Sequence, residues 1–185
     1  MSEAGRTAAE TVRPLIRVRQ VREFTDEPVT AEEVAAIADA GRWSGSSMNT
    51  QPWRLITIRE SATIRRIADA AMPGARSLQT AAAAIALASP DDPGHAVKFA
   101  YDEARVAERI LIAATLLGLG GGISWVAPES RAGIGEILGL PEGRFVRTIV
   151  ALGHPTEAAL KPKSEPGKAR LPRNEVVFEE RWPKV

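Results

Sequence analysis

The clearest hydrophobic pattern lies in the first third of the chain. Apolar residues from Val34 to Gly41 recur at helical spacing and share one helix face. Thr30 and Glu33 stand just before them in the Thr-x-x-Glu pattern of a capping box. The pattern therefore predicts a helix that begins at Thr30 and ends near Gly41–Trp43.

Three later stretches also predict helices. Ser61–Ala71 has helical spacing and is stopped by a Pro-Gly pair. Asp102–Leu117 is the longest candidate, and its second half is apolar nearly all round, which predicts that this half is buried. Gly118–Gly122 is expected to end it. Pro128–Leu138 begins with a proline in its first turn, where proline is tolerated.

Short apolar runs predict the strands. Leu55–Ile58 is typical of a short strand, and Ile149–Leu152 of a buried strand that Gly153 closes. Ala81–Ala88 is apolar without alternation, which fits either a buried strand or a buried helix. We favour a strand for Ile85–Leu87.

The two ends of the chain carry no such pattern. Residues 1–15 are expected to form a mobile or loosely helical tail, and residues 16–185 a single domain. The sequence from His154 onward is rich in proline and lysine and predicts an extended arm. We find no internal repeat and no second domain.

Composition excludes several classes of function. The 185 residues are 44% hydrophobic and 25% charged, as in an ordinary globular domain. The net charge of +1 gives no bulk attraction to nucleic acid or acidic lipid. There is no cysteine, and His95 and His154 stand at no metal-ligand spacing, so we expect no metal site. The longest apolar run, Ile110–Leu119, is much shorter than the roughly 20 residues that cross a bilayer. With no signal-peptide pattern at the start, a cytoplasmic protein is expected.

Two basic clusters are candidates for binding an anion. Arg19 and Arg22, with Arg17 nearby, form the first, and Lys168 and Arg170 form the second. Guanidinium and ammonium groups make charge-assisted hydrogen bonds to phosphate, so two clusters close in space could clamp one. The alternative is that all of them are solvated surface charges.

Two loops are candidates for binding a ring. Ser46–Trp53 is rich in hydroxyl and amide groups, which offer both donors and acceptors to a heterocycle, although a capped turn would have the same composition. Gly118–Gly122 lacks the G-x-G-x-x-G spacing and follows a helix, which excludes a phosphate loop. Its glycines could let the backbone approach a flat ligand or could cap the helix. No nucleophile motif is present.

Taken in order, four blocks resemble the nitroreductase family of FMN enzymes over about residues 16–182. The Ser46–Trp53 block, Ser-Ser-Met-Asn-Thr-Gln-Pro-Trp, is similar to the most specific signature of the family. Val18 and Gln20 stand where the family usually carries Arg and Ser. The other blocks are Arg19–Phe24 with Asp26–Val29, Leu116–Gly120, and Ala151–Pro155 with Lys168–Pro172.

The resemblance implies an α+β fold with a mixed central sheet flanked by helices, built as an intertwined homodimer with a C-terminal arm. It implies FMN at the dimer interface. Arg19, Lys168 and Arg170 would hold the phosphate, with Gln20 beside them, and Arg22 would lie near the ribityl chain or the N1–O2 edge. The remaining assignments are Ser46, Ser47 and Asn49 at the pyrimidine edge, partly from the other protomer, and backbone around Gly121 and Gly122 facing N5.

The implied activity is oxidoreduction with NADH or NADPH as donor, in a ping-pong cycle in which the flavin carries the chemistry and no side chain is catalytic. Acceptors would be nitroaromatics, quinones or similar electron-poor molecules. Two alternatives remain on the same scaffold, a flavin-modifying enzyme and a flavin-binding module without turnover. A third is an interaction domain that binds no cofactor.

Overall fold

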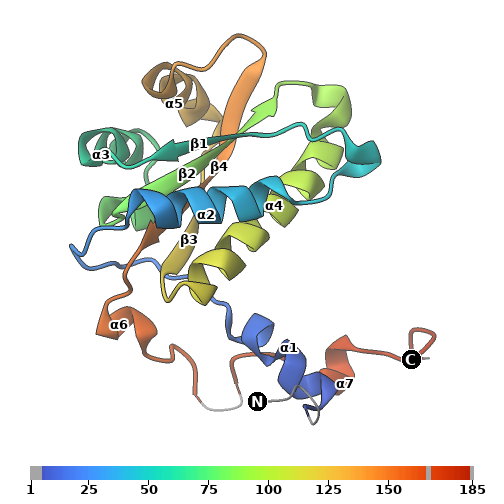
Figure 1. The fold of residues 1–185 in the computed structure, drawn as a ribbon. Helices are drawn as coiled ribbons and strands as arrows, with labels where there is room; N and C mark the ends of the chain where they lie inside the picture. The colour runs from blue at the N-terminus through green and yellow to red at the C-terminus, as the bar shows by residue number, and fades with distance from the viewer. Residues whose placement is uncertain (1–5, 166–167, 184–185) are drawn as a thin grey trace.

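A four-stranded sheet forms the centre of the chain (Figure 1). We describe a computed structural model that covers residues 6–165 and 168–183. The strands run in the order β1-β2-β4-β3, and helices flank the sheet, so the predicted α+β fold is confirmed. The strands are β1 (Arg54–Ile58), β2 (Ala83–Pro90), β3 (Gly120–Trp125) and β4 (Arg144–Gly153).

Both faces of the sheet are buried. On β2, Ile85 and Leu87 pack with α2 (Ala31–Arg42) and α4 (Ala96–Leu116). The alternate residues Ala84, Ala86 and Ala88 pack on the opposite face with α3 (Ser61–Ala70) and α5 (Arg131–Leu138). A strand covered on both faces needs apolar residues at every position, which explains why β2 shows no alternation in sequence.

The sheet itself is not mixed, contrary to the prediction. All three strand pairings, β1 with β2, β2 with β4 and β3 with β4, are antiparallel. Within the described part of the chain, the parallel pairing consists of one isolated bridge, between Gln20 and Gly121. This bridge places the segment that carries Arg19 and Arg22 along the free edge of β3.

Most of the predicted helices and strands are confirmed, with different bounds. The capping box at Thr30 and Glu33 is present and starts α2. The helix predicted for Asp102–Leu117 begins at Ala96 instead. The helix ends at Leu116, just before the predicted stop at Gly118–Gly122, but the strand β3 that begins at Gly120 was not predicted.

The prediction that the second half of α4 is buried is wrong at its end. Leu116 is 71% exposed, and Leu117, just after the helix, is 46% exposed. No element in residues 6–165 or 168–183 covers these two side chains, although Ile110 and Leu111 one turn earlier are buried. The apolar sequence here therefore lies on the surface of the single chain.

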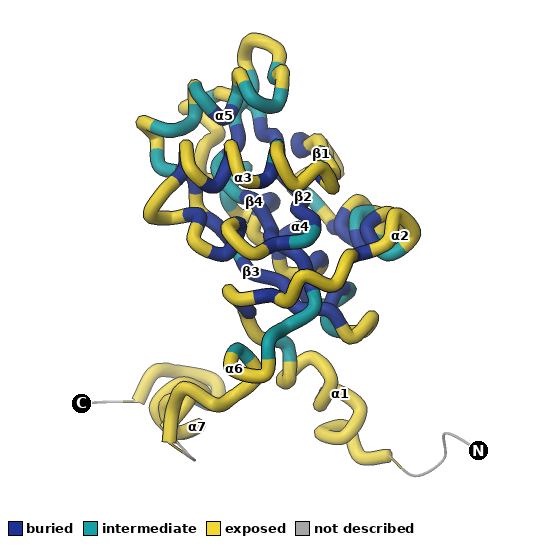
Figure 2. The backbone as a smooth tube through the Cα atoms, turned by 90° about the vertical axis from the view of Figure 1, so that its left-hand side faces the viewer, coloured by how far each residue is buried: buried dark blue, intermediate teal, exposed yellow. Residues whose placement is uncertain are grey.

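The two ends of the chain lie outside the packed body (Figure 2). Thr7 and Glu10 form a second capping box that opens α1 (Ala8–Arg17), a helix with no buried residue that runs past the predicted boundary at residue 15. Residues 1–5 of the predicted tail are outside the described residues. The predicted arm carries two short helices, α6 (Glu157–Leu160) and α7 (Arg173–Val176).

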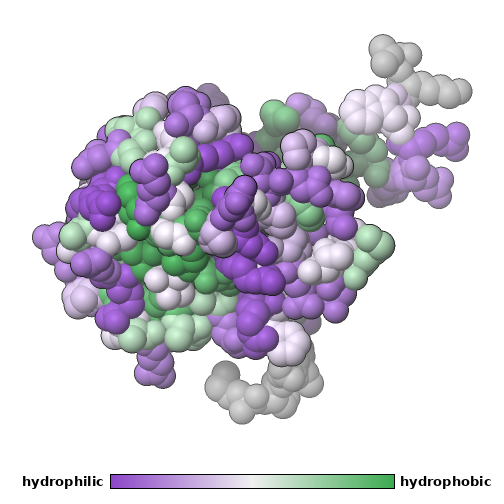
Figure 3. Space-filling view, turned by 90° about the horizontal axis from the view of Figure 1, so that it is seen from above, coloured by the Kyte–Doolittle hydropathy of each residue, from purple (hydrophilic) through white to green (hydrophobic). Residues whose placement is uncertain are grey.

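The surface is mixed in character. From above, apolar side chains occupy the middle of one face and polar side chains surround them (Figure 3). None of the helices in the described part of the chain is both long and apolar enough to span a bilayer.

Candidate functional site

The segment Arg19–Arg22 is fixed against the edge of β3. The Val21 N–H donates to the Gly121 carbonyl at 2.8 Å, and the Ile123 N–H donates to the Gln20 side-chain oxygen at 3.2 Å. Val21 is buried, whereas Arg19 and Arg22 on either side are exposed. Both guanidinium groups therefore lie at the surface of the single chain. Arg19 also donates to the Leu160 carbonyl at the end of α6.

The loop Ser46–Trp53 has an unusual backbone. A 3-10 turn, Ser47–Asn49, contains Met48 at φ 50°, and Asn49 and Gln51 also have positive φ, at 53° and 46°. Non-glycine residues in this left-handed region cost free energy and cluster at functional sites. The Ser46 hydroxyl accepts the Gln51 N–H at 2.8 Å, which closes the loop on itself.

A buried carboxylate holds this loop to α4. Asp102 is 3% exposed, and both of its oxygens accept the Ser47 N–H, at 3.0 and 3.2 Å. Asp102 was not predicted as a site residue, because it stands at the start of the helix predicted for Asp102–Leu117. Its spacing of four from Val106, and of eight from Ile110, put it on the buried stripe and could have identified it.

The C-terminal cations do not join the first cluster in this chain. Lys168 forms an ion pair with Glu165 at 2.6 Å, and Arg170 donates to the Ala169 carbonyl at 2.7 Å. Both residues are exposed. Among the described residues neither of them shares a hydrogen-bond partner with Arg19, and a phosphate clamp of Arg19, Lys168 and Arg170 stays a prediction.

The two halves of the predicted site also lie apart along α4. Ser47 is bonded to Asp102 near its beginning, whereas Val18, next to Arg19, lines a hollow with Ile112. Ten residues of helix separate Asp102 from Ile112, which is roughly 15 Å at 1.5 Å per residue. The loop and the arginines therefore lie near different ends of α4.

The glycines of β3 have a packing reason in this chain. Gly121 and Gly122 are buried, and a Cβ on Gly122 would lie 2.2 Å from the Val21 carbonyl oxygen. A Cβ on Gly121 would lie 2.6 Å from Leu111. The close approach that requires glycine is thus made by the chain's own residues, and a role of this backbone toward N5 stays a prediction.

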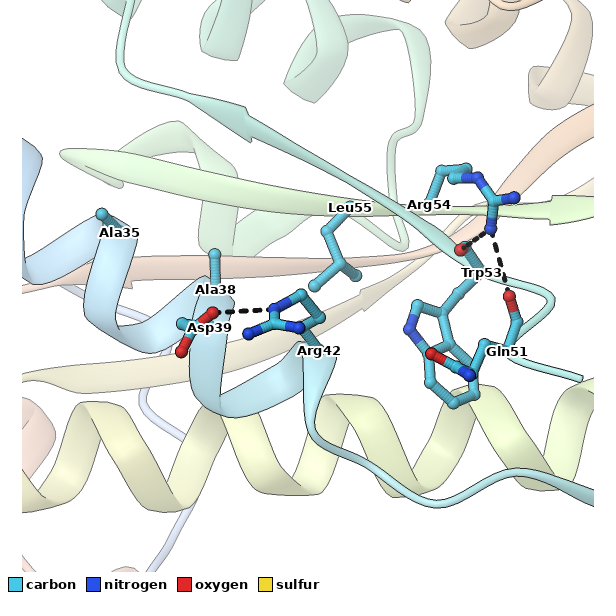
Figure 4. A pocket seen from close by; sticks show the side chains of 8 residues that line it. All are labelled: Ala35, Ala38, Asp39, Arg42, Gln51, Trp53, Arg54 and Leu55. Carbon is cyan, nitrogen blue, oxygen red and sulfur yellow. Dashed lines mark hydrogen bonds and ion pairs between the residues drawn. The ribbon is translucent and has the colours of Figure 1, made fainter. Parts of the chain in front are cut away.

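A hollow of about 420 Å³ adjoins the end of the loop, between α2 and β1 (Figure 4). Trp53 and Leu55 supply apolar surface, and Asp39 and Arg42, bonded at 2.8 Å, lie on its rim. An apolar lining with a few polar groups is typical of a small-molecule pocket. Of the loop, Gln51 and Trp53 line it, but none of the predicted cofactor residues does.

Comparisons with known proteins give a consistent result. The model of the nitroreductase family matches residues 17–105. A protein of Archaeoglobus fulgidus, named for NADH dehydrogenase or NAD(P)H nitroreductase activity, is 30% identical over 155 residues, which cover 80% of this chain and 87% of that protein. The NADPH-flavin oxidoreductase of Vibrio harveyi is 29% identical over 93% of this chain and 74% of its own length.

The fold agrees with these matches. The crystal structure of the Vibrio harveyi NADPH:FMN oxidoreductase, a complex with NAD⁺, superposes with a TM-score of 0.76 at 27% identity. The superposition covers 95% of this chain and 79% of that one.

Proposed function

The chain belongs to the nitroreductase family and is an FMN-dependent oxidoreductase that takes electrons from NAD(P)H, and we propose how it uses its residues to do so. FMN binds between two copies of the chain. Donor and acceptor use the same open face in turn, in a ping-pong order. The acceptors are flat and electron-poor, such as nitroaromatics and quinones.

The chemistry of the residues fits FMN. Arg19 and Arg22 are exposed, and within residues 6–165 and 168–183 neither forms an ion pair with a carboxylate, so both are suited to a phosphate dianion. The hydroxyl and amide groups of the Ser46–Trp53 loop match a ring edge that has both donors and acceptors. The observation that carries the proposal is this loop, held by Asp102 with strained backbone at three residues.

The separation of the two half-sites supports a shared cofactor. One copy would supply the arginines and the other its loop, because the two lie at different places along α4. Exposed apolar side chains near the arginines, Leu15 at 55% and Leu116 at 71%, support contact with a second copy in this region.

Bound FMN would supply the redox chemistry, accepting a hydride from the nicotinamide and passing electrons on. The chain's own residues bind and orient it. Arg19, with Lys168 and Arg170 of the arm, holds the phosphate, and Arg22 stabilises negative charge at the N1–O2 edge. Ser46, Ser47 and Asn49 fix the ring edge, and no side chain transfers a proton.

The visible spectrum of the purified protein tests this proposal. We expect one FMN per chain, and bleaching when NADH or NADPH is added without oxygen. Bleached protein should recover its colour when a quinone or nitroaromatic is added. A colourless protein that takes up no FMN would refute the proposal. Flavin that no nicotinamide donor reduces would favour the flavin-binding module, and flavin consumed during the reaction would favour the flavin-modifying enzyme.

A further inference from the structure

A second hollow, of about 350 Å³, lies on the other side of the Ser46–Trp53 loop and is strongly basic. It is bounded by the end of the loop, the end of β2, the start of α4 and the start of β4. Arg54, Lys98, Arg144 and His95 all line it, and Asp92 is its acidic group. The comparisons and the predicted cofactor site assign no role to this cluster.

Neutral backbone carbonyls hold the two arginines in place. Arg54 Nη1 donates to the carbonyls of Gln51 and Trp53 at 3.1 and 2.8 Å (Figure 4). Arg144 Nη1 donates to the carbonyls of Pro52 and Ala88 at 3.0 and 3.3 Å. Because these partners carry no charge, they orient the guanidinium groups and leave their charges unbalanced.

The acidic group of the hollow is already engaged. Asp92 accepts from Gly94 N at 2.9 Å and lies 2.7 Å from His95 Nδ1, whose hydrogen bond lowers the pKa of the Asp92 carboxyl. Asp91, next to it, lines the neighbouring hollow with Arg144, but the two form no ion pair in the described part of the chain. Arg54, Lys98 and Arg144 therefore face the hollow against one carboxylate, and the nearby N-terminus of α4 adds partial positive charge.

We propose that this basic hollow binds the phosphate-bearing adenosine end of NADPH and gives the enzyme a preference for NADPH over NADH. The inference rests on the proposed function, since it deepens the use of the donor. Thr50 and Gln51 line the hollow and directly follow Asn49, which is assigned to the flavin edge. A donor whose nicotinamide lies on the flavin would therefore have its phosphates close to Arg54, Lys98 and Arg144. Oriented guanidinium groups suit such phosphates better than freely solvated ones, because less side-chain entropy is lost on binding.

Calorimetry with adenosine 2′,5′-bisphosphate tests the hollow directly on the FMN-loaded protein. This probe carries the 2′-phosphate and the adenosine-side 5′-phosphate of NADPH without the nicotinamide half. We expect the double variant Arg54→Ala/Lys98→Ala to weaken its binding by about tenfold or more, because two charge-assisted contacts are lost. Arg66→Ala, on the exposed face of α3, is the matched control and should leave binding unchanged. Equal affinity in the double variant would overturn the proposal.

Donor kinetics then identify the ligand. The KM for NADPH should rise about tenfold in the double variant, and the KM for NADH, which lacks the 2′-phosphate, by a much smaller factor. If the double variant loses binding of inorganic pyrophosphate while the KM for NADPH is unchanged, the hollow takes free phosphates and not the donor, and the proposal is wrong.

Two further checks separate the possible failures. Lys98→Glu is a second variant. Within residues 6–165 and 168–183 the Lys98 ammonium forms no ion pair and lies 5.9 Å from the centre of the Phe99 ring, so its loss should not disturb the fold. It should abolish binding of the bisphosphate, and retained binding would overturn the proposal. Protein that carries no flavin, or flavin that no donor reduces, would refute the proposed function. Calorimetry with the bisphosphate on the protein as purified would still report on the hollow in either case.

Discussion

The carboxylate of Asp102 accepts the backbone N–H of Ser47 with both oxygens, at 3.0 and 3.2 Å, and joins a strained loop to the buried face of α4. Replacing it by Asn keeps the shape and one acceptor oxygen, but puts a buried amide NH₂ where the second oxygen accepted the Ser47 N–H. We expect Asp102→Asn to lower the free energy of unfolding by about 1–3 kcal/mol, the usual cost of an unsatisfied buried polar group. It should also release FMN, since the loop loses its support. Urea unfolding and flavin content measure the two effects.

Asp39→Asn is the matched control for this variant. Asp39 is exposed and pairs only with Arg42 on its own helix, so its loss should change stability by less than about 1 kcal/mol. If Asp102→Asn retained full flavin and wild-type stability, the positioning role of Asp102 would be rejected.

Gly122→Ala tests the packing reason for glycine in β3. The added methyl group would lie 2.2 Å from the Val21 carbonyl oxygen, so the Arg19–Arg22 segment must move away from β3. We expect a loss of about 1–3 kcal/mol, as for other overpacked sites. Gly133→Ala in α5, where no atom lies within 4 Å of the new methyl, should instead stabilise by about 0.5–1 kcal/mol. Thermal unfolding measures the stability of both variants. An equal change in stability for Gly122→Ala and Gly133→Ala would contradict the packing explanation.

The sequence predicted elements better than it predicted their bounds. The capping box at Thr30 and the spacing that follows were sufficient for α2, because both signals are local. β3 was missed because the glycines Gly120–Gly122 predict the end of a helix. The strand forms through pairing with β4 and with the Arg19–Arg22 segment. Such pairing partners lie far along the chain and leave no local pattern.

The same difference between local signals and partners far along the chain applies to the site. The Ser46–Trp53 loop could be proposed from the hydroxyl and amide groups of its own sequence. The helical spacing could have placed Asp102 on the buried face of α4, but it could not show that Asp102 meets Ser47, 55 positions away. The arm cations Lys168 and Arg170 were predicted to join Arg19, but in one copy they bond within the arm. Their role toward a phosphate therefore stays a prediction.

The capping box of α2 predicts a pH-dependent contribution to stability. Hydrogen bonds from the Thr30 backbone N–H and then from its hydroxyl lower the pKa of Glu33 below its ordinary value of 4.5. A lowered folded-state pKa stabilises the protein above pH 4.5, and this stabilisation is lost as the pH falls through the folded-state pKa. Glu33→Gln should therefore be less stable than wild type at pH 7, with the difference shrinking below pH 4.5. Glu32→Gln, beside it without a capping bond, removes the same charge and is the control. Urea titrations at each pH measure both variants, and the same pH dependence in both would contradict the capping explanation.

The arm cations can be tested for phosphate binding. If Lys168 and Arg170 hold the phosphate with Arg19, replacing both by Ala should weaken FMN binding by about tenfold or more, since two charge-assisted contacts are lost. Lys161→Ala/Lys163→Ala removes the same charge from the same arm and is the control. Flavin released on dialysis gives the comparison, and equal retention by both double variants would refute the assignment of Lys168 and Arg170.

Mixing two defective proteins tests whether FMN is shared between copies. Arg19→Ala and Asn49→Ala should each lose flavin alone, because each removes one half of the site. In a dimer with one chain of each kind, one site combines both defects, and the other joins the intact Arg19 of one chain to the intact Asn49 of the other. Random exchange of subunits makes half of the dimers mixed, so flavin should return to about one quarter of the wild-type amount per chain. A site built within one chain would regain none, because no chain carries both residues. Flavin absorbance after unfolding and refolding the mixture, against each variant treated alone, therefore distinguishes a shared site from a site within one copy.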